Sequence, residues 1–312
     1  MNIQKAASKL QELQKSIGEV IFGQDTAIET ILVGLLAEGH VLIEGLPGLA
    51  KTSIANTLAK LLDCPFKRIQ FTPDLLPGDL IGTTMYIPQD HSFRISKGPI
   101  FTHVLLADEI NRAPAKVQSA LLEAMQEKQV TIGGESFPLP TPFFVIATQN
   151  PIEHQGTYPL PEAQIDRFML KVSIDYPNED AEKTMLKEKL ENQKGTVKPI
   201  LNPEEIAALQ NASKTIYADE KILEYTINLA KATRMPSKLL QFGASSRACL
   251  HLVQSAKALA LIRGRAFVTP DDIKEISYSV LKHRLRLTFE AEAEEKKPED
   301  ILKDLLCHLP VP

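Results

Sequence analysis

Hydrophobic positions follow two different periods in the first half of this chain. Short, continuous apolar runs are typical of strands buried on both faces of a parallel sheet, and apolar residues three and four positions apart are typical of helices. The apolar runs predict strands at 41–44, 66–71, 103–107, 143–148 and 169–174. The helical spacing predicts helices at 25–37, 52–62, 114–127 and 161–166. Their alternation predicts an α/β fold, a three-layer αβα domain with a mainly parallel five-stranded sheet.

Beyond Pro177 the pattern contains helical spacing only. It predicts helices at 179–192, 203–211, 219–233, 245–263 and 270–283. Two of these helices have clear starts, because Asn202 and Thr269 are capping residues followed by proline at the first helical position. We therefore expect an αβα domain at residues 1–176 and an all-α domain at residues 177–312. Residues 290–300 are rich in Glu and Lys and are expected to be a solvated, weakly ordered part of a charged C-terminal tail.

Two stretches of the first domain have the pattern of β-hairpins. Between residues 80 and 99, two β-prone pieces flank the turn-forming residues 88–92. In residues 129–138, the pair Gly133-Gly134 fits a two-residue hairpin turn. Each is interpreted as a hairpin inserted into the domain, and the pattern leaves open whether it is a surface hairpin or contacts a substrate.

Composition sets limits on location and partners. The 312 residues are enough for two cores, and the net charge of −4 gives no basic footprint for nucleic acid. Cys64, Cys249 and Cys307 have no metal-ligand spacing and suit reduced thiols. Residues 3–17 have helical spacing in place of a signal peptide, and no apolar run is long enough to span a bilayer. We expect a cytoplasmic protein.

The most informative stretch is a glycine-containing loop between a predicted strand and a predicted helix. The candidates for nucleotide binding in this loop are Gly45, Pro47, Gly48, Leu49, Ala50, Lys51, Thr52 and Ser53. Such a loop offers backbone N–H groups to phosphate, while Lys51 can reach the outer phosphates and the Thr52 hydroxyl can hold Mg²⁺. Ala50 stands where a second glycine usually precedes the lysine, which is tolerated if its φ stays negative. The alternative is a chance Gly/Pro turn before a helix.

Polar side chains follow two further predicted strands. The apolar run 104–107 ends in Asp108 and Glu109, which would face the Mg²⁺ shell and polarise the attacking water, respectively. The next strand ends in Thr148-Gln149-Asn150, and Asn150 can orient the water or contact the γ-phosphate. The alternative makes both acids caps of the helix that starts near Pro114. Because ligands bind at the carboxyl ends of parallel strands, we expect these strand ends to converge on one nucleotide.

Six motifs, in this order, resemble those of the AAA+ ATPases and, within them, of the MoxR family. The similarity extends from Val20 to about Leu287. The motifs are Val20-Ile21-Phe22-Gly23-Gln24, Gly45 to Thr52, Asp108-Glu109-Ile110-Asn111-Arg112-Ala113, Ala147-Thr148-Gln149-Asn150-Pro151, residues 160–168 and Gly243-Ala244-Ser245-Ser246-Arg247-Ala248. Ala50 is itself what MoxR-like loops usually carry.

The resemblance implies a function and its cofactors. It implies ATP and Mg²⁺, a homo-oligomeric ring of six subunits, and hydrolysis of ATP to remodel or mature partner proteins in a chaperone-like role. The partner in this family is often a protein with a von Willebrand factor A domain. Ile21, Gly23 and Gln24 become candidates for nucleotide binding, and the second domain becomes the helical lid. The two hairpins match a helix-two insert and a pre-sensor hairpin, which face the central channel in related rings.

The resemblance also assigns roles to arginines. Arg167 looks like the finger that one subunit inserts into its neighbour's nucleotide site, and its alternative is a local salt bridge with Asp166 or Glu162. Arg247 is expected as the second residue of a helix capped by Ser245, from where it reaches back over the phosphates.

Several questions stay open at the level of sequence. Arg112 could serve the site or the ring interface, and Gln70 could link a bound substrate to Glu109 or be a plain surface residue. One rival function is a nucleotide-switch scaffold with little hydrolysis, against which Glu109 argues. The other is a chelatase-type or nucleic-acid motor subunit. The absence of a basic, aromatic-rich extension argues against the nucleic-acid version.

Overall fold

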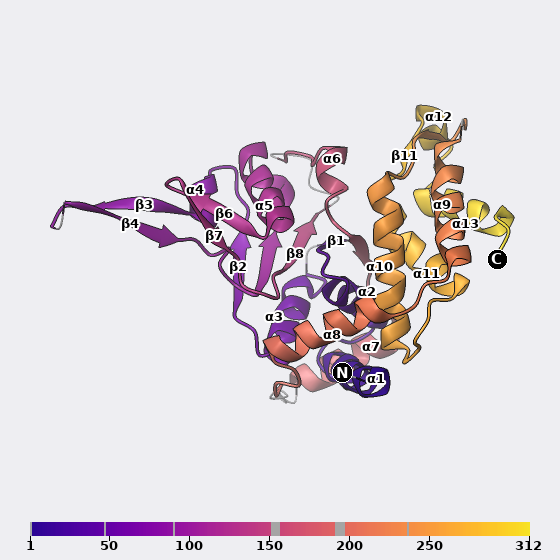
Figure 1. Ribbon diagram of the computed structural model, residues 1–312, viewed down its shortest axis with the longest axis horizontal. Coiled ribbons are helices and arrows are strands. Elements are labelled where there is room, and N and C mark those ends of the chain that lie inside the picture. Colours follow the sequence, from indigo (N-terminus) through magenta and orange to yellow (C-terminus); the bar gives the residue numbers. More distant parts are fainter. Residues whose placement is uncertain (1, 47, 90, 151–156, 191–196, 236) are drawn as a thin grey trace.

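The structure is a computed structural model that describes residues 2–46, 48–89, 91–150, 157–190, 197–235 and 237–312. Figure 1 shows an α/β body that carries a long hairpin arm on one side and a group of helices on the other. Pro47 and Pro151 of the motifs lie outside the described residues. So do part of the turn expected at 88–92 and the last two residues of the helix expected at 179–192.

The central sheet has five strands, and every pairing in it is parallel. Its order is β2 (Phe66–Gln70), β5 (Val104–Asp108), β8 (Phe144–Gln149), β1 (Val41–Gly45) and β9 (Leu170–Ile174). Every residue of β5 is buried, because Val104 and Leu106 face one layer of helices while Leu105 and Ala107 face the other. A strand covered on both faces needs this unbroken apolar run. The predicted sheet is confirmed.

Helices cover both faces of the sheet. α2 (Asp25–Leu36) and α3 (Lys51–Leu61) bury their apolar residues in the core on one face, and α5 (Ala115–Glu127) and α4 (Pro77–Ile81) bury theirs on the other. α1 (Ile3–Gly18) lies over α2 and α3. The three-layer αβα prediction is confirmed, and α4 is an addition to it.

The chain beyond Pro177, which we call the lid, is mainly helical, as expected. It contains α7 (Glu179–Leu190), α8 (Pro203–Thr215), α9 (Glu220–Arg234), α10 (Ser246–Ile262) and α11 (Pro270–Leu281). The predicted caps are confirmed, since Asn202 and Thr269 accept hydrogen bonds from the backbone N–H groups of Glu205 and Asp272. One addition is a short antiparallel pair, β10 (Leu240–Phe242) with β11 (Arg286–Leu287). Among the described residues, no helix is long and apolar enough to cross a membrane.

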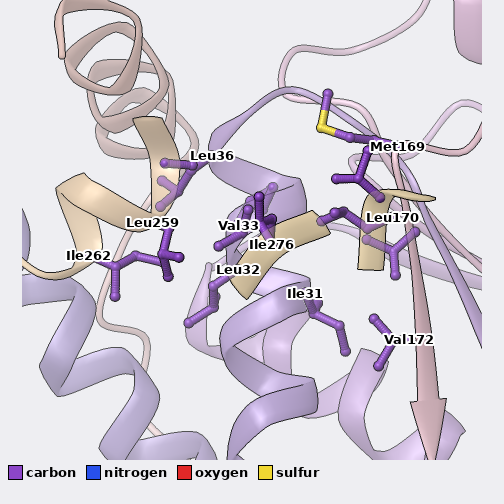
Figure 2. Close-up of a cluster of buried hydrophobic side chains, with 14 of the residues drawn as sticks. Ile31, Leu32, Val33, Leu36, Met169, Leu170, Val172, Leu259, Ile262 and Ile276 are labelled. Atoms are coloured by element: carbon purple, nitrogen blue, oxygen red, sulfur yellow. The ribbon is translucent and has the colours of Figure 1, made fainter. Parts of the chain in front are cut away.

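The lid shares its core with the αβα domain. Figure 2 shows Leu32 and Leu36 of α2 beside Leu259 and Ile262 of α10, with β9 on the other side of α2. α10 also packs against α1 and α8, and Lys9 of α1 forms an ion pair with Glu205 of α8. The first helix of the chain is therefore held by the lid as well as by the sheet layer.

The C-terminal segment differs from its prediction. Residues 292–297 are exposed, but the segment is not weakly ordered, because most of it is helical: it begins within α12 (Phe289–Ala293) and ends within α13 (Pro298–His308). α13 buries Ile301, Leu302 and Leu306 and packs against α9 and α11. The start of α13 was not predicted, because its first residues belong to the charged stretch 290–300 and its apolar residues follow only from Ile301 onward.

Both predicted hairpins are present. β6 (Gln129–Ile132) pairs with β7 (Glu135–Pro138), and Gly133 and Gly134 between them have φ of 61° and 90°, as a tight turn requires. β3 (Gly82–Ile87) pairs with β4 (Ser92–Lys97) to form the arm in Figure 1. The arm exposes Met85, and it exposes Tyr86 and Phe93 with their ring centroids 5.2 Å apart.

One histidine of the core is held as a neutral ring. The N–H of Val145 donates to Nδ1 of His40 at 3.1 Å, which leaves the proton on Nε2 to be donated to the Met125 carbonyl at 3.2 Å. Burial lowers the pKa of His40 to about 4. His40 directly precedes β1 and lies at the end of the sheet opposite Gly45.

Candidate functional site

The glycine-containing loop connects β1 to α3. β1 ends at Gly45, where an added β-carbon would come within 2.7 Å of the carbonyl oxygen of Ile174 in β9. Gly48 has a φ of 84°, and a β-carbon on it would meet no heavy atom of the described residues within 4 Å. The loop is therefore open above Gly48, which leaves room for a phosphate group at the N-terminus of α3.

Ala50 corrects one expectation. Its φ is 57° and its ψ 14°, in the left-handed region, whereas we expected a negative φ. The residue is exposed, so its methyl group has room, but the left-handed conformation itself costs about 1 kcal/mol or more for a residue with a β-carbon. Ala50, directly before α3, therefore adopts the left-handed conformation although this conformation is unfavourable for alanine.

Lys51, Thr52 and Ser53 form the first turn of α3. The Nζ of Lys51 donates to the Gly45 carbonyl at 2.6 Å, so the ammonium group lies over the loop that precedes it. Thr52 is half-buried and Ser53 is exposed, while Leu49 before them packs on the core. A cation and a row of backbone N–H groups therefore meet at one helix N-terminus, which suits an anionic ligand.

Asp108 ends β5 beside the loop. Its Oδ1 accepts a hydrogen bond from Oγ1 of Thr148 at 2.5 Å. Its Oδ2 accepts from Nε and Nη2 of Arg68 at 3.0 and 2.6 Å. The side chain is only 10% exposed, and this carboxylate is thus fixed by β8 on one side and by β2 on the other.

Glu109 turns away from the strand in the left-handed region, with a φ of 56°. Its N–H donates to Oγ1 of Thr148 at 2.8 Å, and its Oε2 accepts from Nε2 of Gln70 at 2.6 Å and pairs with Nε of Arg112 at 3.2 Å. Both residues whose roles the sequence left open, Gln70 and Arg112, therefore contact Glu109. α5 begins after Pro114 without a side-chain cap, so the helix-capping alternative for the two acids is wrong.

The three expected strand ends do lie together. β8 lies between β1 and β5, so Asn150, which is buried and directly follows β8, is placed between Gly45 and Asp108. With strands about 4.8 Å apart, the outer two ends are separated by about 10 Å. Backbone amides, a lysine, an amide side chain and two carboxylates thus border one site at the carboxyl edge of the sheet.

The residues expected near the nucleotide from the N-terminal motif differ in their position. Ile21 is buried in the core, whereas Gly23 and Gln24 line a hollow of about 370 Å³ at the carboxyl end of β9. Nε2 of Gln24 donates to the Asp175 carbonyl at 2.8 Å. From the lid, Lys282 enters the same hollow and donates to Oγ of Ser173 at 2.7 Å, and burial lowers the pKa of its ammonium group. The hollow is at the end of β9 that adjoins Gly45.

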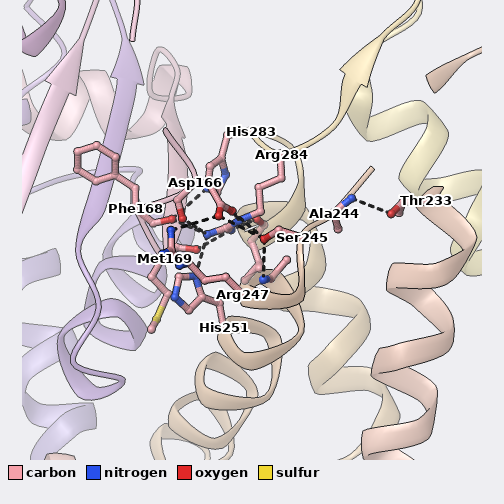
Figure 3. A network of polar contacts seen from close by, with 12 residues as sticks. Asp166, Phe168, Met169, Thr233, Ala244, Ser245, Arg247, His251, His283 and Arg284 are labelled. Atoms are coloured by element: carbon pink, nitrogen blue, oxygen red, sulfur yellow. Dashed lines mark hydrogen bonds and ion pairs between the residues drawn. The ribbon is translucent and has the colours of Figure 1, made fainter. Parts of the chain in front are cut away.

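Arg167 and Arg247 lie elsewhere. The N–H of Met169 bonds the His40 carbonyl, so the segment that carries Arg167 is at the amino ends of β1 and β9, roughly 15 Å of strand away from Gly45. Ser245 caps α10 as predicted, but Nη1 of Arg247 pairs with Oδ2 of Asp166 at 3.3 Å (Figure 3). The structure therefore does not bring Arg247 to the phosphate loop of its own subunit, in contrast to our expectation.

The local salt-bridge alternative for Arg167 finds no support. Asp166 is engaged by Ser245, Arg247 and Arg284, and Glu162 pairs with Arg286 at 3.6 Å. Among the described residues, the guanidinium group of Arg167 has no hydrogen-bond or ion-pair partner. The neighbouring Asp166 is thus held in place, while the side chain of Arg167 is half-exposed.

Sequence reasoning missed three residues that build these sites. Arg68 and Thr148 hold Asp108, and Arg284 holds the segment around Arg167. A polar residue at the end of an apolar strand is a usable signal for Thr148, because a neighbouring parallel strand ends beside it. The sequence gives no comparable signal for Arg284, which is buried only by the packing of the lid.

The residues present fit Mg²⁺ bound together with a nucleotide. Within the part of the chain that the structure describes, no group of three or more His, Cys, Asp or Glu side chains could hold a metal alone. Mg²⁺ typically binds one or two protein oxygens plus substrate phosphates, and Thr52 and Asp108 supply such oxygens. The site can therefore bind a phosphorylated ligand and, at Glu109, accept a proton from water.

Comparison with known proteins agrees with this geometry. Residues 40–170 match the ATPase family associated with various cellular activities (AAA), and residues 233–305 match the AAA lid domain. Chaperone MoxR1 of Mycobacterium tuberculosis is 45% identical over 98% of this chain and 84% of its own length. Protein MoxR of Paracoccus denitrificans is 29% identical over 100% and 98%. The crystal structure of a predicted ATPase from Cytophaga hutchinsonii is 44% identical, covers 99% of this chain and 97% of its own, and superposes with a TM-score of 0.92.

Proposed function

This chain belongs to the MoxR family of AAA+ ATPases, and from that premise we propose that it hydrolyses Mg²⁺-bound ATP in a ring of six subunits to remodel or mature partner proteins. One observation carries the proposal. The phosphate loop and the two acids lie at one end of β1 and β9, while Arg167 and Arg247 lie at the other. One subunit therefore has half of a site at each end, and a ring of identical copies would join the halves.

Within one subunit, each residue has a separate task. Lys51 and the N–H groups of the loop bind the phosphates, and Thr52 and Asp108 hold Mg²⁺, which neutralises the charge of the phosphates. Glu109 accepts a proton from the attacking water, whose oxygen bonds to the γ-phosphorus as the bond to the bridging oxygen breaks. ADP and phosphate leave. The bonds from Gln70 and Arg112 keep the Glu109 carboxylate oriented for this step.

The second half of the site comes from the neighbouring subunit. Arg167 has a permanently charged guanidinium group with no partner among the described residues, which suits the charge that develops on the transferred phosphoryl group. Arg247 pairs with Asp166 on the same segment, which supports a role for it at the neighbour's nucleotide together with Arg167. Asn150 contacts the γ-phosphate or the water from its own subunit.

The partner of the ring is a protein. The relative from M. tuberculosis is named a chaperone, which supports remodelling as the use of the hydrolysis energy. The exposed tip region of the β3–β4 arm, with Met85, Tyr86 and Phe93, offers apolar contacts to such a client, of which a von Willebrand factor A domain protein is one candidate. The three cysteines are free, which supports a cytoplasmic location.

The proposal is tested by separating binding from hydrolysis. Glu109→Gln should bind ATP with unchanged affinity and lose phosphate release by about two to four orders of magnitude. Glu123→Gln is the matched control, because Glu123 is exposed on α5 and should change neither quantity. The mass of the assembly in ATP should be that of six subunits. A wild-type protein that binds ATP and assembles without releasing phosphate would make the chain a nucleotide switch instead.

A further inference from the structure

A buried arginine of the lid holds the segment that carries Arg167. Arg284 follows α11, and its side chain is only 2% exposed. Nη2 donates to the carbonyls of Asp166 at 3.1 Å and Phe168 at 2.7 Å, and Nη1 donates to the carbonyl of Met169 at 3.2 Å. These carbonyls belong to the residues on both sides of Arg167, as Figure 3 shows for Asp166, Phe168 and Met169.

The same guanidinium group is also bound to a carboxylate. Nε of Arg284 donates to Oδ1 of Asp166 at 2.7 Å, and the other oxygen of Asp166 pairs with Arg247 at 3.3 Å. The hydroxyl of Ser245, which caps α10, contacts both oxygens at 3.2 Å. Asp166 is thus the acceptor shared by both lid helices that approach the segment.

The two arginines at Asp166 are held differently. The side chain of Arg247 is 41% exposed and makes one long contact to this carboxylate, so it can leave without stranding a buried charge. Arg284 has its donors distributed over the carboxylate, backbone carbonyls and Nδ1 of His251, whose pKa burial lowers to about 3. Removing Arg284 from this cluster would leave several buried acceptors unpaired, which is costly. Arg284 therefore stays with the segment while Arg247 is free to move.

The hydrogen bonds of Arg284 are not needed simply to hold the lid against the αβα domain. The apolar residues of α2, α10 and α11 already bury a continuous core there. A planar fork of five donors that engages backbone on both sides of one residue fixes the direction in which that residue projects. Here that residue is Arg167, whose own guanidinium group has no partner among the described residues.

We propose that Arg284 is a positioning residue that fixes, from the lid, the direction in which Arg167 projects into the neighbouring subunit's ATP site. This inference rests on the proposed function, in which Arg167 acts in trans. Its consequence is that the lid of one subunit controls hydrolysis in the next one. A lid that shifts relative to β9 carries Arg284, and with it the backbone around Arg167.

The test uses mixed rings in which each mutant has one defect. Lys51→Ala subunits cannot bind ATP but can donate Arg167, and Arg167→Ala subunits bind ATP but cannot donate. Their co-assembled mixture should regain hydrolysis where an intact loop meets an intact Arg167. Adding Arg284→Met to the donor, Lys51→Ala, should reduce this recovered activity by about 10- to 100-fold, the loss expected for an arginine misplaced by about 1 Å.

The reciprocal arrangement distinguishes positioning from general damage. Arg284→Met in the acceptor, Arg167→Ala, should leave the recovered activity within about twofold, because that subunit contributes no finger. Arg286→Met in the donor is the matched control, since Arg286 is more than half exposed and pairs only at 3.6 Å with Glu162 on the same segment. If Arg284→Met does not fold, Arg284→Lys serves, because an ammonium group cannot reach the carboxylate and the carbonyls together.

Each outcome has one meaning. Equal losses in donor and acceptor, or no loss in the donor, would overturn the positioning role of Arg284. If the Lys51→Ala and Arg167→Ala mixture co-assembles and regains no hydrolysis, the proposal that Arg167 acts in trans is refuted. That mixture is measured without any change at Arg284, so the two failures are distinguishable.

Discussion

Thr148 offers a sharp test of how the two acids are held. It is fully buried, and its hydroxyl donates to Asp108 and accepts from the N–H of Glu109. Thr148→Val keeps the shape of the side chain and removes both hydrogen bonds. The change therefore acts on the carboxylate expected to hold the metal and on the backbone of the residue expected to activate water.

The structure gives the size of the effect. An unpaired backbone N–H costs about 1–2 kcal/mol and a lost bond to a charged group about 1.5–3 kcal/mol. Asp108 keeps Arg68, and water can reach its partly exposed side chain, so the sum is reduced to about 2–4 kcal/mol. The rate of hydrolysis should fall by about 100-fold, because Glu109 loses the contact that fixes its left-handed backbone. The affinity for ATP should fall less.

Thr226→Val is the matched control. Thr226 is equally buried, but its hydroxyl donates only to the carbonyl of Ile222, one turn back in α9. Its loss should cost at most about 1 kcal/mol and leave hydrolysis unchanged. The assays are urea unfolding, compared at constant m-value, and phosphate release. Equal stability losses in the two variants, with hydrolysis unaffected in Thr148→Val, would refute the reasoning.

Three further predictions follow from the same structure. Lys51→Ala should abolish ATP binding in calorimetry while the chain stays folded, and wild-type affinity would contradict the role given to Lys51. Ala50→Gly should raise the free energy of unfolding, measured in urea, by roughly 0.5–1 kcal/mol, because glycine removes the strain of a left-handed alanine. This gain exceeds the loss caused by the greater flexibility of glycine in the unfolded chain, and a lower free energy of unfolding would contradict the reasoning. His40 is neutral in the folded state, so the unfolded chain takes up the proton first and stability should fall as the pH drops from about 6.5 towards 4. The part of the loss that comes from His40 is about 2 kcal/mol at pH 5, and His40→Gln should remove this part of the pH dependence.

Local patterns predicted the parts of the structure that local physics decides. The unbroken apolar run of β5, the cap at Asn202 and the turn at Gly133-Gly134 each express a preference of a few neighbouring residues. The acids at the end of β5 were also predictable, because the parallel sheet places strand ends side by side. For these elements sequence pattern and structure agree.

The expectations that the structure corrects concern features that depend on contacts between distant segments. Ala50 adopts a conformation that its own residue type disfavours, because the path from β1 into α3 requires it. Arg247 begins its helix as predicted, but the packing of the whole lid decides which end of the sheet it reaches. The apolar residues of α13 were hidden behind a charged run, and their burial requires α9 and α11.

The packing of α1 against α10 has a consequence for how the chain is made. α1 is synthesised before its partner α10, which ends about 240 residues later. At roughly 5–20 residues per second, the apolar stripe of Leu10, Leu13 and Ile17 waits on the order of 10–50 s for part of its cover. During that time the part of this stripe that α10 will cover stays exposed to water. α1 is therefore made early and packed late, because its cover is complete only after α10 has been synthesised.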